Sequence, residues 1–182
     1  MKIDPRIESE AQRLLDKHRM STLPIAVEDL AKKENANVFP FDLGDDVSGI
    51  LHITNGIANI GYNPTESKVR QRFTIAHGLG HLTLHREKGQ VFVDNEKYYQ
   101  FIIFRKTKLS DDDMEIEQEA NAFAAALLMP LSLIQEELQG YDGFDLSDNS
   151  MIYELAKKFE VSTQAMSYRI INLSNDNKIQ RH

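Results

Sequence analysis

The sequence predicts an α+β fold in which helices surround a small three-stranded sheet. Apolar residues recur at helical spacing in several segments, beginning with residues 5–19. Two apolar runs, 49–53 and 57–62, flank an Asn-Gly pair, which is a strong hairpin signal. The short run 38–41 contains a proline and therefore indicates an edge strand. Together these patterns predict a sheet of one hairpin and one edge strand, with helices before and after it.

The composition is ordinary for a globular chain of 182 residues, with 41% hydrophobic and 27% charged residues. No apolar run approaches the roughly 18 residues of a membrane-spanning helix. The first residues lack the apolar stretch of a signal peptide. Cysteine is absent, which excludes disulfides and thiolate metal ligands. A cytoplasmic location is therefore expected, and a net charge of -7 argues against broad, non-specific nucleic-acid binding.

The chain is predicted to be a single domain, 1–182, with three successive parts. The first part, 1–64, holds two helices and the hairpin. The second part, 65–130, holds two longer helices separated by an insert, 86–110, whose short apolar runs indicate strands or a lid. The later of these two helices is expected to be capped by Ser110 and to end before Pro130. The third part, 131–182, is predicted to be helical.

Two histidines in the second part have the spacing of metal ligands. His77 and His81 lie four residues apart in a predicted helix that Thr65 or Ser67 can cap. Residues at i and i+4 share one helix face, so both imidazoles can reach one ion, as in the metal-binding half of the H-E-x-x-H motif. His85 continues the spacing but lies about 12 Å from His77 along a continuous helix. We therefore expect His85 to support the site or to end the helix, and not to bind the ion.

A third ligand has to come from another helix, and Glu119 is the main candidate. Ala122, Phe123 and Ala126 follow it at i+3, i+4 and i+7, a spacing that predicts a core-facing stripe. A carboxylate on an apolar face needs a charged partner or a metal ion. The sequence therefore predicts that Glu119 completes the metal site.

Other assignments on this helix remain open. Glu119 could instead form a buried ion pair with Arg70 or Arg72. Glu115, one turn earlier on the same face, is the fallback ligand. Glu117 and Gln118 are expected to face solvent.

Four segments of the chain together carry a family resemblance: residues 72–77, 80–81, 84–85 and 119–130. In this combination the chain resembles the ImmA/IrrE family of zinc metallopeptidases, over most of residues 20–172. The resemblance implies a zincin-like fold with His77, His81 and Glu119 as ligands of Zn²⁺. Mn²⁺ is an alternative, because two imidazoles and a carboxylate suit both ions. Family members typically cleave a helix-turn-helix repressor and so release its target genes, in stress responses and in mobile elements.

Position 78 departs from the family pattern, which has a glutamate there. That carboxylate takes a proton from the attacking water and passes it to the leaving amine. Such groups contribute about 10² to 10⁴ in rate, and Gly78 cannot replace one. Very low peptidase activity is therefore expected, while metal binding should survive.

Three interpretations of Gly78 compete. It can be a natural loss in a pseudopeptidase, or an engineered or accidental change in an active peptidase. Thirdly, Glu115 or Glu117 can serve as the base; this is the least favoured, because a base must lie within hydrogen-bonding reach of the water.

The last two predicted helices, near 151–159 and 163–173, resemble a helix-turn-helix. Apolar residues have the required spacing, and Ser162 can cap the second helix. That helix offers one formal charge, so a packing role is favoured over DNA recognition.

These observations predict an ImmA/IrrE-type metallo-endopeptidase-like protein that acts on a helix-turn-helix transcriptional repressor, with catalysis impaired by Gly78. The alternative is a non-catalytic pseudopeptidase or antitoxin-like regulator that binds a protein partner. A transcription factor that uses the C-terminal helices is a third, weaker option. Direct DNA binding and membrane association are not expected.

Overall fold

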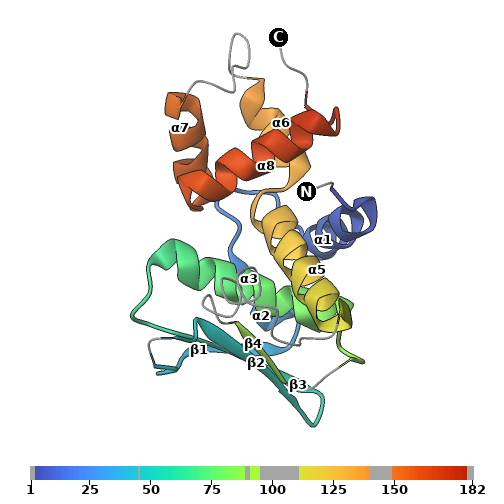
Figure 1. Ribbon diagram of the computed structural model, residues 1–182, viewed down its shortest axis with the longest axis vertical. Coiled ribbons are helices and arrows are strands. Elements are labelled where there is room, and N and C mark those ends of the chain that lie inside the picture. Colours follow the sequence, from blue (N-terminus) through green and yellow to red (C-terminus); the bar gives the residue numbers. More distant parts are fainter. Residues whose placement is uncertain (1–2, 45, 89–90, 95–110, 140–148, 180–182) are drawn as a thin grey trace. The chain divides into compact units, whose positions relative to one another are not determined.

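The computed structural model describes residues 3–44, 46–88, 91–94, 111–139 and 149–179. The chain divides into two compact units. Val27–Ala124 form the first, which we call the sheet unit, and Met1–Ala26 with Ala125–His182 form the second, the helical unit. The four strands and helix α3 (Lys68–Leu84) belong to the sheet unit (Figure 1), and with α3 the predicted metal-site histidines. In the described part of the chain, no helix is both long and apolar enough to cross a bilayer.

The sheet has four strands in the order β1-β3-β2-β4. Their bounds are Ala36–Pro40 for β1, Gly49–Thr54 for β2, Ile57–Tyr62 for β3 and Val91–Asp94 for β4. β1 pairs with β3 in parallel, and β2 pairs antiparallel with both β3 and β4. The sequence predicted three strands, so it missed one strand, β4. β4 comes from the start of the predicted insert, most of which lies outside the described residues.

The β2–β3 hairpin turns at Asn55 and Gly56, as the sequence predicts. Both have positive φ, 52° and 79° respectively, as a two-residue turn of the primed type requires. The register places Leu51 opposite Ile60, and both side chains are buried. Because side chains alternate between the faces of a strand, this register directs the apolar set of both strands to one face.

Helix α3 (Lys68–Leu84) lies on that face and contacts β2, β3 and β4 (Figure 1). Ser67 is its N-cap, and the Ser67 hydroxyl accepts a hydrogen bond from the Arg70 N–H. The short helix α2 (Val27–Lys33) packs on β1 and α3. These contacts bury the middle of α3, including both predicted histidine ligands.

Helix α5 (Asp111–Leu128) begins in the sheet unit and continues into the helical unit. Its predicted cap, Ser110, lies outside the described residues. The helix ends before Pro130 as expected, because proline lacks the N–H that would continue the hydrogen-bond ladder.

The helical unit contains α1 (Pro5–Lys17), α6 (Leu131–Leu138), α7 (Asn149–Phe159) and α8 (Thr163–Asn175). α7 and α8 pack against each other through buried residues such as Leu155 and Met166. Ser162 caps α8 by accepting a hydrogen bond from the Ala165 N–H. The predicted pair of C-terminal helices is therefore present.

Candidate metal centre

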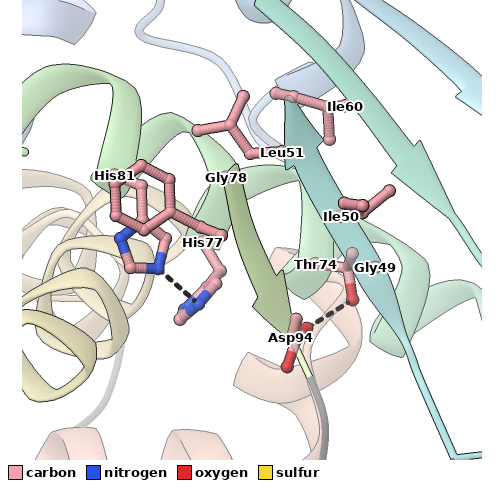
Figure 2. Close-up of a pocket in the computed structure, with 10 residues that line it drawn as sticks. Gly49, Ile50, Leu51, Ile60, Thr74, His77, Gly78, His81 and Asp94 are labelled. Atoms are coloured by element: carbon pink, nitrogen blue, oxygen red, sulfur yellow. Dashed lines mark hydrogen bonds between the residues drawn. The ribbon is translucent and has the colours of Figure 1, made fainter. Parts of the chain in front are cut away.

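One face of α3 presents His77 and His81 to the same point. The side chains are buried, and their Nε2 atoms lie 3.0 Å apart across one helical turn (Figure 2). Each imidazole therefore directs the nitrogen farthest from the backbone toward its neighbour. Two nitrogens held in this way can share one ion.

Glu117 of α5 completes the group. Its Oε2 lies 3.3 Å from His77 Nε2, and its Oε1 lies 3.3 Å from His81 Nε2. In the described part of the chain these three residues form a group that could hold a metal ion. Ligand atoms about 2.0–2.1 Å from a tetrahedral zinc ion lie about 3.3 Å from one another. The observed separations therefore fit a divalent ion bound by two imidazoles and one carboxylate.

The carboxylate in this group differs from the predicted one. Glu117 was expected to face solvent, and that expectation is wrong, because its side chain is only 21% exposed and contacts both histidines. Glu119 is not part of the group; its Oε2 lies 2.8 Å from His85 Nε2. Glu115, the fallback ligand, is exposed. Arg70, considered as a partner of Glu119, instead pairs with Asp94.

The burial of α5 explains the difference. The deepest stripe on the helix runs through Ala120, Phe123 and Ala124, each 0% exposed. Glu117 lies one turn before Ala120 on that stripe. Ala122, which belonged to the predicted stripe, is only half-buried. Because α5 is apolar on more than one side, spacing alone supports two different inward faces.

Gly80 allows α3 and α5 to approach closely. A Cβ added at Gly80 would lie 3.0 Å from the carbonyl oxygen of Ala120 and 3.1 Å from its Cα. Both are backbone atoms of α5, which cannot move aside as a side chain can. The absence of a side chain at position 80 therefore brings Glu117 within reach of the histidines.

The charges of the group favour a cation. Burial by itself raises the pKa of Glu117, but hydrogen bonds from His77 and His81 outweigh it and hold that pKa well below its usual value. Burial lowers the pKa of His81, although its hydrogen bond to Glu117 opposes this. The carboxylate is thus ionised and His81 neutral at pH 7, the states in which both groups bind a metal.

Gly78 lies between the two histidines and lines the same small cavity, of about 10 Å³ (Figure 2), which is close to the space of one water molecule. A Cβ at position 78 would lie 3.3 Å from three side-chain carbons of Ile60 on β3. Asp94 contributes a carboxylate to the cavity, but Arg70 donates to its Oδ1 and Thr74 to its Oδ2. Each oxygen of the Asp94 carboxylate therefore already accepts a hydrogen bond from a neighbouring side chain.

The sequence profile of the IrrE N-terminal-like domain family of peptidases matches residues 31–170. This chain belongs to the ImmA/IrrE family. Uncharacterized immunity region protein 2 of Bacillus phage phi105 is 30% identical over 124 residues, which are 68% of this chain and 68% of that protein. The family is one of metallopeptidases, which agrees with a His–Glu metal site in the sheet unit.

A solved structure of a Mycobacterium tuberculosis transcriptional regulator has a similar fold, with a TM-score of 0.65 over 97% of this chain. The two sequences are 18% identical, and this chain spans half the length of that protein. At this identity the likeness establishes the fold alone. The family match and the helices around a small sheet confirm the α+β, zincin-like fold predicted for an ImmA/IrrE member.

Proposed function

We propose that this protein binds a divalent metal ion through His77, His81 and Glu117 and acts on a helix-turn-helix transcriptional repressor, with peptide cleavage impaired by Gly78. The convergence of three ligand atoms at separations of 3.0–3.3 Å carries the proposal. Zinc is the preferred ion and manganese the alternative, because two imidazoles and a carboxylate suit both. A bound ion would supply Lewis-acid polarisation of a peptide carbonyl.

The proposed impairment follows from the side chains around Gly78. A general base has to reach the attacking water within about 3 Å. Among the described carboxylates nearby, Glu117 faces both imidazoles and Asp94 is held by Arg70 and Thr74. Glu115 is exposed. These contacts support a loss of about 10² to 10⁴ in cleavage rate relative to an enzyme with a base at position 78.

The names of two similar proteins support a role in gene regulation. One is an immunity region protein of a phage, and the other is a transcriptional regulator. Within the proposal, this chain acts on a repressor protein and does not itself contact DNA. The cation of α8, Arg169, is 5% exposed and pairs with Glu8, whereas Tyr168 and Ile171 are exposed. A recognition helix without an exposed cation offers no charged contact of its own to a DNA phosphate or base.

A second candidate is a non-catalytic regulator, either a pseudopeptidase or antitoxin-like, that binds a protein partner without cutting it. The packing of Ile60 against Gly78 favours this alternative, because a larger side chain at position 78 requires Ile60 to move. Both candidates share the same metal site. They differ in the effect of a glutamate at position 78, which should restore cleavage in an impaired peptidase and should not do so in a non-catalytic regulator.

The metal site is tested by the metal content and melting of the purified protein. We expect about one Zn²⁺ per chain by elemental analysis and a melting temperature that falls in EDTA. Glu117→Gln should abolish both results, because it removes the carboxylate charge from the ligand set. Glu115→Gln makes the same change at an exposed position of the same helix and should retain both. Equal behaviour of the two variants would contradict the proposed ligand.

Cleavage is tested with a purified helix-turn-helix transcriptional repressor as the substrate. The Zn²⁺-loaded wild type should leave it intact over hours, and Gly78→Glu should cut it about 10² to 10⁴ times faster. Many turnovers per minute by the wild type would contradict impaired catalysis. If both forms bind the repressor and Gly78→Glu still fails to cut it, the non-catalytic regulator replaces the peptidase.

A further inference from the structure

We infer that Glu119 and His85 form a hydrogen-bonded chain that orients His81 for the metal ion. The inference rests on the proposed metal site and adds two positioning residues outside its ligand set. Glu119 Oε2 lies 2.8 Å from His85 Nε2, and His85 Nδ1 lies 3.3 Å from His81 Nδ1. His81 then turns its other nitrogen toward His77 and Glu117. The chain therefore runs from the Glu119 carboxylate to the ligand atom of His81.

The protons of this hydrogen-bonded series can be placed by starting from its two ends, the metal-bound His81 and the Glu119 carboxylate. When His81 Nε2 binds a metal, the ring proton is on Nδ1, which must donate. His85 Nδ1 is the partner and must accept, so the His85 proton is on Nε2. That nitrogen donates to Glu119, and an ionised carboxylate only accepts. Each bond in the chain thus has one donor and one acceptor.

An ordinary ion pair between Glu119 and His85 does not meet this requirement. In such a pair His85 is protonated on both nitrogens. Its Nδ1–H would then face the Nδ1–H of a metal-bound His81, and two donors would oppose each other at 3.3 Å in a buried site. The neutral, Nε2-protonated form of His85 avoids this conflict. Glu119 therefore acts as a hydrogen-bond acceptor for a neutral ring.

The rings of the chain are also held mechanically. His85 is the C-cap of α3, where its backbone N–H donates to the His81 carbonyl at 2.8 Å. The ring of Phe92, on β4, stacks on His81 with 4.2 Å between centroids and 18° between planes. Both histidine rings are 1% exposed. Water therefore does not readily replace His85 as the partner of His81.

The second histidine ligand lacks such support. His77 Nδ1 is buried and has no hydrogen-bond partner among the described residues. Phe73 stacks on the His77 ring with 6.1 Å between centroids, which is farther than the 4.2 Å between Phe92 and His81. The hydrogen bonds that end at Glu119 thus orient His81 and not His77. We therefore expect Glu119 to act on the metal ion through His81.

The affinity test compares four variants by Zn²⁺ competition with a chromophoric chelator. Glu119→Leu removes the acceptor and should weaken Zn²⁺ binding by about 10- to 100-fold, the usual effect of losing a partner of a metal ligand. Glu119→Gln keeps a neutral acceptor and should lose less. Glu115→Leu and Glu115→Gln make the same changes at an exposed position of α5 and should stay within about twofold of the wild type. A role of Glu119 through charge alone predicts equal losses for Leu and Gln, which would overturn the inference.

Histidine ¹⁵N NMR of the Zn²⁺-loaded wild type tests the chain without a variant at position 119. We expect His85 to carry its proton on Nε2 and to accept at Nδ1, and His81 to carry its proton on Nδ1. A His85 protonated on Nδ1, or on both nitrogens, would overturn the inference even if the Glu119 variants fail to fold. If neither the wild type nor the Glu115 variants bind Zn²⁺, the metal site and this inference both fall. If they bind and the Glu119 variants bind equally well, the inference alone fails.

Discussion

Each unit of the protein buries a cluster of polar side chains, and the two clusters differ in the charges that they bring together. In the helical unit, Arg169 donates through Nε to the Met129 carbonyl at 3.1 Å and through both terminal nitrogens to the Glu8 carboxylate. In the sheet unit, His77 and His81 direct nitrogens toward each other and toward the Glu117 carboxylate. The first cluster pairs a cation with an anion. The second brings two imidazole nitrogens and one carboxylate to a single point.

This difference shows how polar burial relates to stability and to binding. The Arg169 cluster matches donors with acceptors, and its charges neutralise each other, so it needs nothing further. The histidine cluster has an anionic carboxylate and at least one neutral imidazole, because the pKa of Glu117 and that of His81 are both lowered. A divalent cation satisfies all three ligand atoms together. We therefore expect the first cluster to be indifferent to metal and the second to depend on it.

The largest expected effect comes from breaking the Arg169–Glu8 cluster. Arg169→Met leaves Glu8 without its guanidinium partner and should cost about 3 kcal/mol of unfolding free energy, the lower end for a buried pair because Glu8 is 22% exposed. Urea denaturation measures this loss. It should be the same in Zn²⁺ and in EDTA. The double variant Glu8→Met with Arg169→Met should recover most of it, and a metal-dependent loss would show that the two clusters are coupled.

The next effect comes from adding Zn²⁺ to the histidine cluster. Zn²⁺ at a free concentration of 100 times its Kd should raise the unfolding free energy by about 2.7 kcal/mol relative to EDTA, because it binds the folded state. Arg169→Met should show the same increment from its lower baseline. Thermal melts with and without the ion provide the measurement. An unchanged wild-type melting curve would mean that the three ligand atoms do not bind the ion.

A smaller effect is expected from a substitution that increases the distance between α3 and α5. Gly80→Ala places a Cβ about 3 Å from the Ala120 backbone and should cost about 2 kcal/mol, as overpacking typically does, despite the better helix propensity of alanine. It should also weaken Zn²⁺ binding, because Glu117 moves away with α5. Urea denaturation and Zn²⁺ competition measure the two losses.

Gly78→Ala is the matched control on the same helix. The three atoms nearest to its Cβ are all side-chain carbons of Ile60, at 3.3 Å, whereas the two nearest at position 80 are backbone atoms of α5. Its stability should stay within about 1 kcal/mol of the wild type, because the tight contact offsets the gain in helix propensity. Zn²⁺ affinity should change little. If Gly78→Ala weakens Zn²⁺ as much as Gly80→Ala does, the contact between α3 and α5 is not what positions Glu117.

Local features were predictable from the sequence. The Asn55-Gly56 turn requires two positive φ angles, which few residue pairs adopt easily, so the hairpin can be inferred from two residues. The four-residue spacing of His77 and His81 places them on one face of any helix that contains them. Pro130 ends α5 because its nitrogen is part of the ring and has no N–H to donate. Each of these depends on backbone geometry over a few residues.

Only the tertiary structure decided which groups meet. The choice between Glu117 and Glu119 depended on which side of α5 lies closest to α3, and spacing could not settle it because α5 is apolar on more than one side. The strand β4 needed β2 as a partner, since four residues alone do not form a strand. The burial of Arg169 depended on Glu8, which is 161 positions away in the chain. Contacts between distant segments depend on how the elements pack. A sequence pattern shows which faces of a helix or strand can be buried, but not which partner each face will contact.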